Sequence, residues 1–147
     1  MVDRITRKHR SWNMSRITSK NTAPELAVRS VLHKLGYRYR LHGKDLPGNP
    51  DIVLPRHKTV VFVHGCFWHR HARCRYTYSP KSNQAAWNRK FRENVARDRS
   101  NVRALRALGW RIVVIWQCRT ERLEVLQQTI RKSFSILSSA ATVKLRG

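Results

Sequence analysis

The sequence predicts a single α/β domain in which a mixed central sheet is flanked by helices. Two long helical patterns bracket short apolar segments, and the predicted element order is α-β-β-β-α-β-α. The chain has 147 residues, of which 41% are hydrophobic, so it can bury a core and is unlike a disordered protein.

The first predicted helix has clear signals at both ends. Thr22 can cap it, Pro24 fits its first turn, and Glu25 completes a capping box. Gly36 can end it in a left-handed conformation. The apolar stripe between these ends consists of Val28, Val31, Leu32 and Leu35.

Three predicted strands follow. Residues 37–41 alternate in polarity, whereas 51–54 and 59–63 are continuously apolar, which is typical of strands buried on both faces. Periodicity is then lost from 64 to 82, where histidines, cysteines, aromatic and basic residues crowd together.

A long helix is predicted from Gln84 to Leu108, ended by Gly109. A buried strand over 111–116 and a final helix from Glu121 to about Phe134 complete the pattern. The stripe of the long helix consists of Trp87, Phe91, Val95, Val102 and Leu105.

Basic segments flank the compact domain, which is predicted over residues 21–136. Residues 1–20 carry six Lys or Arg and one acid, and are expected to form an arm that orders on DNA. Residues 137–147 are expected to form a polar, basic tail.

The charge of the chain limits its partners. Thirty-one Lys and Arg against 8 acids leave a net charge of +23, which favours nucleic acid as the partner. An anionic membrane is the weaker alternative, since no apolar run approaches the ~20 residues of a spanning helix. No signal-peptide pattern is visible, so we expect a cytoplasmic protein.

Three cysteines and one histidine have the types and spacing of zinc ligands. Cys66, His71 and Cys74 lie close together, and Cys118 follows the last predicted strand. Such a set suits a closed tetrahedral zinc site, which would brace the irregular 64–82 loop. Three free thiols are the alternative.

Asp51 opens one predicted strand and His64 ends the next, which places both at the same sheet edge. A carboxylate there suits Mg²⁺, and His69 could accept a proton from an attacking water. The alternatives are a turn acid for Asp51, and zinc ligation or a solvated loop for the histidines.

Two further acids have an open choice of roles. Asp98 interrupts the apolar stripe of the long helix and therefore needs a partner, either in an active site or in an arginine salt bridge. Glu25 is explained equally well by the capping box and by an active-site role, and the two are compatible.

Aromatic residues interleave with basic ones. Phe67 and Trp68 are poorly explained as core and could wedge between base pairs. Met14 in the basic arm could do the same, unless it is an ordinary arm residue, whereas Trp87 fits the core stripe.

Several motifs resemble the very-short-patch-repair (Vsr) mismatch endonuclease family over about residues 11–118. The most specific is HGCFWH at 64–69, preceded by LPGNPDIV at 46–53. The others are MSRI at 14–17, KNTAPE at 20–25, NVARD at 94–98, GWR at 109–111 and WQC at 116–118.

The resemblance implies a restriction-endonuclease-like αβββαβ core with a zinc-braced loop, and a nick 5′ to the thymine of a T:G mismatch. It implies Mg²⁺ at Asp51 and at the backbone carbonyl of Val63, His69 as general base supported by Asp98, and Glu25 and His64 near the metal-bound waters. The structural zinc ligands would be Cys66, His71, Cys74 and Cys118. The DNA-contacting residues would be Phe67, Trp68 and Trp87 from the major groove, Met14 from the minor groove, and Lys90 and Asn94 near the mismatched pair.

The chain departs from the family pattern at three places. Val63 stands where a threonine is usual, the interval between His71 and Cys74 is one residue longer, and Gln117 replaces an acid. An acid-x-Lys pair, common in restriction enzymes, is also missing, which fits a histidine-based variant.

We therefore expect a monomeric, Mg²⁺-dependent DNA-nicking enzyme with structural zinc, acting on double-stranded DNA that carries a T:G mismatch. The alternatives are a restriction-type or broader-mismatch nuclease of the same fold, and a non-enzymatic zinc-stabilised DNA-binding module.

Overall fold

The computed structural model describes the backbone of residues 21–146 and the side chains of residues 21–135. The predicted basic arm, with Met14, lies outside the described residues. No helix within the described part is both long and apolar enough to cross a lipid bilayer.

Four strands form one mixed sheet in the order β1-β2-β3-β4. They are β1 (Arg40–Leu41), β2 (Ile52–Leu54), β3 (Thr59–His64) and β4 (Arg111–Trp116). The pairs β1–β2 and β2–β3 are antiparallel, whereas β3 and β4 are parallel. The predicted mixed sheet is confirmed, and its likeness to a restriction-endonuclease core stays a prediction.

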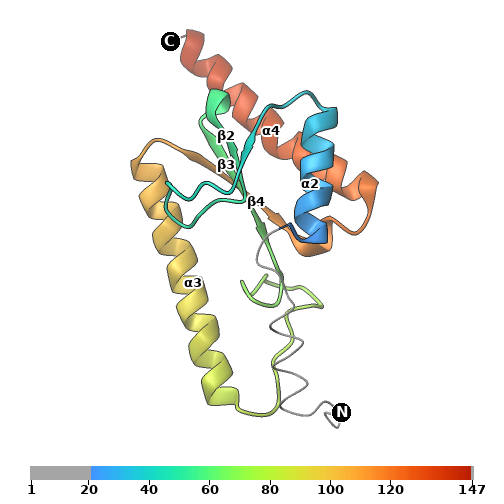
Figure 1. The fold of residues 1–147 in the computed structure, drawn as a ribbon, viewed down its shortest axis with the longest axis vertical. Coiled ribbons are helices and arrows are strands. Elements are labelled where there is room, and N and C mark those ends of the chain that lie inside the picture. The colour runs from blue at the N-terminus through green and yellow to red at the C-terminus, as the bar shows by residue number, and fades with distance from the viewer. Residues whose placement is uncertain (1–20, 147) are drawn as a thin grey trace.

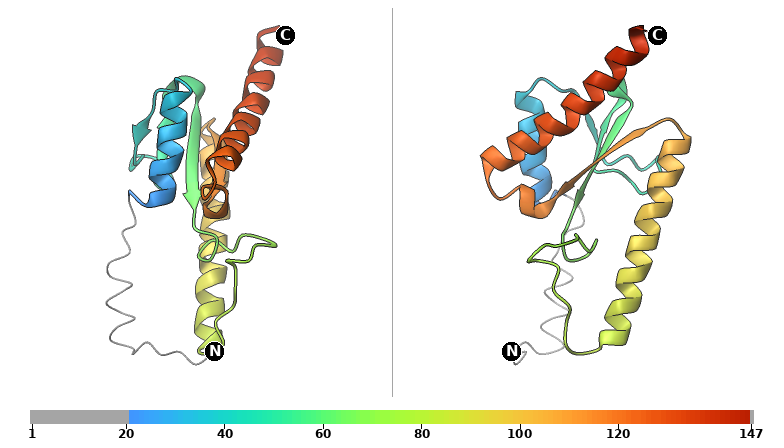
Figure 2. Two further views of the ribbon diagram at one scale, coloured as in Figure 1. Left: turned by 90° about the vertical axis from the view of Figure 1, so that its right-hand side faces the viewer. Right: turned by 180° about the vertical axis from the view of Figure 1, so that it is seen from behind.

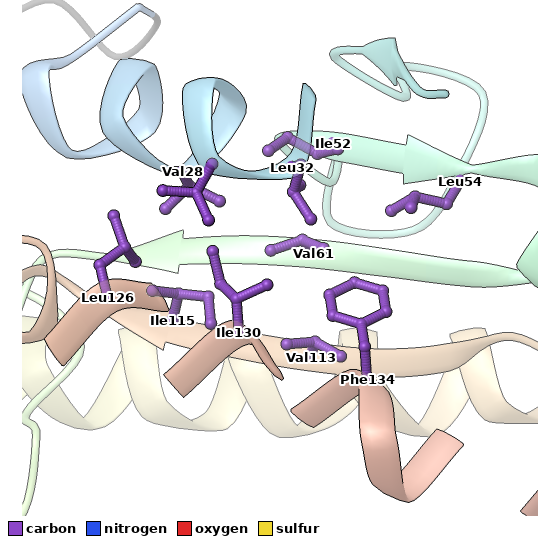
Figure 3. Packing of buried hydrophobic residues seen from close by; sticks show 11 residues of the cluster. Val28, Leu32, Ile52, Leu54, Val61, Val113, Ile115, Leu126, Ile130 and Phe134 are labelled. Atoms are coloured by element: carbon purple, nitrogen blue, oxygen red, sulfur yellow. The ribbon is translucent and has the colours of Figure 1, made fainter. Parts of the chain in front are cut away.

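Helices cover both faces of this sheet (Figures 1 and 2). Helices α2 (Ala23–Lys34) and α4 (Leu123–Arg146) pack together with the side chains of one face. Helix α3 (Gln84–Ala107) packs on the opposite face through Leu105. Figure 3 shows the main core, which contains Val28, Leu32, Ile52, Leu54, Val61, Val113, Ile115, Leu126, Ile130 and Phe134. Since side chains alternate along a strand, the neighbours Val53, Val60 and Phe62 form the smaller core with Leu105.

The ends of α2 agree with the sequence. Thr22 caps the helix, accepting a hydrogen bond from the Glu25 amide at 3.4 Å, and Gly36 follows its end with φ of 86°. The strand predicted at 37–41 is wrong in its first half: only Arg40 and Leu41 pair with β2. The amide of Tyr37 bonds instead to Leu32, so the chain is still closing the helix there.

Two other expectations need correction. Helix α4 runs to Arg146 rather than ending near Phe134, because neither glycine nor proline interrupts the chain before Gly147. In α3, only Phe91 and Leu105 of the predicted stripe are buried. The N-terminal half of α3 extends past the sheet, beside the loop over residues 65–83 (Figure 1), so the stripe there faces that loop.

The loop between β1 and β2 positions Asp51, and at Gly48 it packs against Asn101 of α3. Gly48 has φ of 76°, and a Cβ atom there would lie 2.8 Å from Nδ2 of Asn101. We expect Gly48→Ala to lower the free energy of unfolding by about 1–2 kcal/mol, measured by urea denaturation. Gly65→Ala is the matched control, because its nearest neighbours would be 3.7 Å away. Equal stability of both variants would contradict this account.

Candidate active site and metal centre

The four predicted zinc ligands meet at the end of β4. Their ligand atoms all lie within 4.8 Å of one another, although Cys118 is far from the others in sequence. The parallel pairing of β3 and β4 explains this meeting, because His64 and Trp116 are register partners and both strands end at the same sheet edge. His71 Nδ1 lies 3.5 Å from Cys118 Sγ, and the Cys118 amide donates to Cys66 Sγ at 3.4 Å.

The surroundings of this cluster suit a metal. The Thr77 hydroxyl donates to the carbonyls of His71 and Cys66 at 2.7 and 3.2 Å, which closes the turn around the ligands. Burial raises the pKa of Cys66 to about 12 and also raises the pKa of Cys118. Since burial disfavours these thiolates, a cation at the centre is needed to hold the ligands in their charged form. A Cys₃His set of this closed kind fits structural zinc.

A second cluster joins His64, His69 and Asp98. His69 Nδ1 lies 2.6 Å from Oδ2 of Asp98, a residue in the middle of α3. The rings of His64 and His69 are stacked, with centroids 3.9 Å apart and an interplanar angle of 3°. When the proton is on Nδ1 and is donated to Asp98, Nε2 of His69 keeps a free lone pair. The arrangement can therefore act as a proton acceptor.

His64 supports this geometry as a neutral ring. Burial lowers its pKa to about 4, and the charge of His69 acts in the same direction against the smaller opposing effect of Asp98. Two stacked imidazoles cannot easily both be protonated. His64 is thus held in its neutral form beside His69.

Asp51 lies beside this cluster but is not one of the three grouped ligands. Its Oδ2 accepts a 2.7 Å hydrogen bond from the Val63 amide, which ties β2 to the end of β3. Burial raises the pKa of Asp51 from 3.8 to about 6, and the charge of Glu25 adds to this. The Val63 hydrogen bond and the charges of His69 and Arg29 oppose the rise. A bound divalent cation would favour the ionised carboxylate, so the residue fits a metal ligand.

Glu25 lies at the capped start of α2, and its carboxylate accepts from the Asn21 amide rather than from the Thr22 amide expected of a capping box. Its side chain is buried beside Asp51, and its Oε2 accepts from the Asn21 amide at 3.0 Å. It also forms an ion pair with Arg29 at 3.2 Å. Sequence reasoning missed Arg29, although a basic residue four positions after an acid on a helix was an available signal. Arg29 Nε is buried and, among the described residues, has no hydrogen-bond partner.

An aromatic cluster lies between loop 65–83 and the N-terminal half of α3. Phe67 is at its centre, with the rings of Trp68, Trp87 and Phe91 at 5.1, 5.6 and 5.2 Å. Tyr78, which the sequence did not indicate, also contacts Phe67 at 4.9 Å. We call these five residues the aromatic cluster.

Lys90 and Asn94 lie next to this cluster. Lys90 Nζ is 5.1 Å from the Trp68 ring, and Asn94 Nδ2 donates to the Trp68 carbonyl at 3.2 Å. Both come from α3, the helix that also carries Asp98. One helix therefore links the aromatic cluster to the His69–Asp98 pair.

The His69–Asp98 pair opens into a cleft of about 640 Å³ between α3 and β4. Arginines line its α3 side, and Trp116 and Val114 line its β4 side. The lining arginines are Arg99, Arg103 and Arg106. Such a basic surface favours an anionic substrate at the histidine pair.

Comparison with known proteins gives a consistent result. The family model described as "DNA mismatch endonuclease Vsr" matches residues 2–75. The "Type II nicking enzyme V.XorIIP" of Xanthomonas oryzae pv. oryzae is 51% identical over 131 residues, covering 89% of this chain and 96% of the relative. The "Type II nicking enzyme V.NmeAIP" of Neisseria meningitidis is 40% identical, covering 90% and 94%. The "DNA mismatch endonuclease Vsr" of Escherichia coli is 38% identical, covering 80% and 75%.

Proposed function

Because the chain belongs to the Vsr family of DNA mismatch endonucleases, we propose that it nicks one strand of duplex DNA 5′ to the thymine of a T:G mismatch. The observation that carries this proposal is the hydrogen-bonded His69–Asp98 pair beside the half-buried Asp51. A cytoplasmic location and a monomer, as expected from the sequence, suit an enzyme that cuts one strand of cellular DNA.

The chemistry assigned to the site is phosphodiester hydrolysis. His69 Nε2 accepts the proton of the attacking water, while Asp98 holds the ring and stabilises the imidazolium that results. His64 restricts the position of the His69 ring by stacking on it. His69 thus has both the orientation and the charge compensation that a general base requires.

The Asp51 carboxylate and the Val63 carbonyl would hold Mg²⁺, which when bound polarises a phosphate and stabilises the leaving oxygen. With the backbone carbonyl as the only ligand at position 63, valine would serve there as well as threonine, whereas a role for the threonine hydroxyl would lower activity. Glu25 lies close enough to affect the charge of Asp51, and would accept hydrogen bonds from water at the site. Cys66, His71, Cys74 and Cys118 would hold zinc, which braces the loop that carries His69.

Three rings of the aromatic cluster are assigned to mismatch recognition. Phe67, Trp68 and Trp87 would enter the stacked bases, and Lys90 and Asn94, which contact Trp68, would reach the mispaired edges. Unstacking costs a few kcal/mol and is least costly at a mispair. The lower unstacking cost at a mispair would let the protein discriminate mispaired from correctly paired DNA.

The decisive experiment compares end-labelled duplexes that differ only in T:G against C:G at one position. With Mg²⁺, we expect a nick in the thymine strand of the T:G duplex alone, and none with EDTA. Cleavage of both duplexes would identify a broader nuclease of the same fold. Binding without cleavage of either would identify a DNA-binding module.

Replacing Asp98 tests the assigned general base. We expect Asp98→Asn to lower the single-turnover nicking rate by about 10²–10⁴-fold, because the imidazolium loses its carboxylate partner. Affinity for the T:G duplex should stay within about twofold. Glu93→Gln, an exposed acid of the same helix, should nick at the wild-type rate. A fast Asp98→Asn enzyme would remove His69 from this role.

A further inference from the structure

Tyr78 is a large aromatic residue that the activity described above does not use. Its side chain is 63% exposed, yet its ring lies against Phe67 with a centroid distance of 4.9 Å and a tilt of 33°. It therefore extends the aromatic cluster outward to solvent. Burial in a core does not explain its position, because most of its surface stays accessible.

Arg70 holds the backbone that presents Tyr78. Its Nη1 donates to the Tyr78 carbonyl at 2.9 Å and its Nη2 donates to Ser79 Oγ at 3.2 Å. The same guanidinium lies 3.9 Å from the ring centroid of Phe91 and 5.8 Å from that of Phe67. One side chain thus ties the segment around Tyr78 to α3 and to the aromatic cluster.

This fixation depends on the planar fork of arginine. Two donors reach two acceptors while the face of the guanidinium stacks on a ring, which a lysine ammonium cannot reproduce. Arg70 itself has φ of 55°, a left-handed conformation that is uncommon for non-glycine residues. From this conformation the fork reaches both Tyr78 and Ser79.

The charges around Tyr78 indicate the class of its partner. Arg70 and Lys90 both face rings of the aromatic cluster. The acid Glu121 is engaged by Tyr76 and Arg75 of the same loop. An exposed ring among cations suits nucleic acid, whose bases stack and whose phosphates need countercharges.

We propose that Tyr78 is a further DNA-contacting residue that stacks on a base next to the mismatch, and that Arg70 is the positioning residue that presents it. This inference rests on the proposed function and adds a specificity residue to it. A mispaired base is easier to unstack, so the gain from stacking on Tyr78 is larger at T:G than at C:G.

The test measures dissociation constants of the full chain by fluorescence anisotropy, with zinc retained and no divalent cation that supports nicking. We expect Tyr78→Ala to weaken binding of the T:G duplex about tenfold, and of the C:G duplex less than twofold. The slope of log Kd against log salt should not change, because no charge is lost. Tyr78→Phe keeps the ring and should bind both duplexes like wild type.

Two arginine variants separate positioning from charge. Arg70→Lys keeps the charge but loses the fork, so it should lose the T:G preference while keeping the salt slope. Arg73→Met, an exposed cation of the same loop, should weaken both duplexes equally and reduce the slope. Zinc content and thermal stability of the Tyr78 variants should match wild type, since Tyr78 is mostly exposed.

The outcomes distinguish this inference from the function on which it rests. A wild-type preference for T:G that survives Tyr78→Ala overturns the role of Tyr78 and leaves the proposed function standing. A T:G preference that survives Arg70→Lys overturns the positioning role of Arg70. A wild-type protein with equal affinity for T:G and C:G overturns the proposed function and this inference together.

Discussion

Replacing Asp51 by asparagine is expected to abolish nicking while making the metal-free protein more stable. The carboxylate is the assigned Mg²⁺ ligand, and losing several kcal/mol of transition-state stabilisation lowers the nicking rate at least ~10³-fold. The same carboxylate is buried, with its pKa raised from 3.8 to about 6. One substitution should therefore change activity and stability in opposite directions.

The sign of the stability effect follows from proton binding. Between pH 3.8 and about 6 the folded protein holds the Asp51 proton more tightly than the unfolded chain does. The contribution of Asp51 to the free energy of unfolding is therefore fully present below about pH 4, and it is lost as the pH rises through about 6. Asparagine carries no such charge, so the variant should exceed wild type by about 1–3 kcal/mol at pH 7.5 and not at pH 4.

Urea denaturation of the metal-free proteins from pH 4 to 8 measures this difference. Added Mg²⁺ should raise the Tm of wild type and not that of Asp51→Asn, because only a bound cation stabilises the folded state. Asp45→Asn is the matched control. Asp45 is an exposed acid of the loop that precedes Asp51, and it is paired with Arg40 of β1. A variant that nicks, or that is less stable than wild type at pH 7.5, would contradict the assignment of Asp51.

Removing zinc is expected to inactivate the protein and to disorder the loop that carries His69. Cys66, His71, Cys74 and Cys118 connect loop 65–83 to the end of β4, and that loop has little apolar core of its own. Structural zinc contributes its binding free energy directly to folding. We expect Cys74→Ala or a strong chelator to cost more than about 3 kcal/mol and to lower the Tm by more than about 10 °C.

Metal analysis, thiol titration and tryptophan emission together measure this effect. The native protein should hold one zinc per chain and protect all three thiols, which chelation exposes. Trp116 stacks on His71 at 4.2 Å, so its emission should change when zinc leaves. His33→Ala, on the exposed surface of α2, is the control and should keep its zinc. A metal-free, active protein with three accessible thiols would establish the free-thiol alternative.

Local patterns predicted the parts of the fold and site that depend on local physics. The capping residues gave the start of α2, and continuous apolar runs gave β2 and β3. Asp98 was indicated because an acid on an apolar helix face needs a partner, and His69 is that partner. Cys118 was indicated by residue type, and the parallel β3–β4 pairing supplies the reason it reaches Cys66.

The remaining features depend on tertiary contacts without a local signature. Tyr78 meets Phe67 across a segment without periodicity, in which Arg70 takes a left-handed conformation. The partly buried Arg29 lies within an otherwise ordinary helix pattern, which gave no indication of its role. Strand β1 is short because the end of α2 uses the Tyr37 amide. The roles assigned to the metals and to the mismatch stay predictions.

Helix α3 also constrains which length changes the gene can accept. Trp87, Lys90 and Asn94 lie on the same rigid rod as Asp98, at a rise of about 1.5 Å and a rotation of about 100° per residue. One inserted or deleted codon between Asn94 and Asp98 would rotate Trp87, Lys90 and Asn94 by about 100° relative to the Asp98 carboxylate and shift them by about 1.5 Å. Insertions and deletions of whole residues should therefore be found in the connecting loops. This stretch of helix should accept substitutions but no inserted or deleted residue.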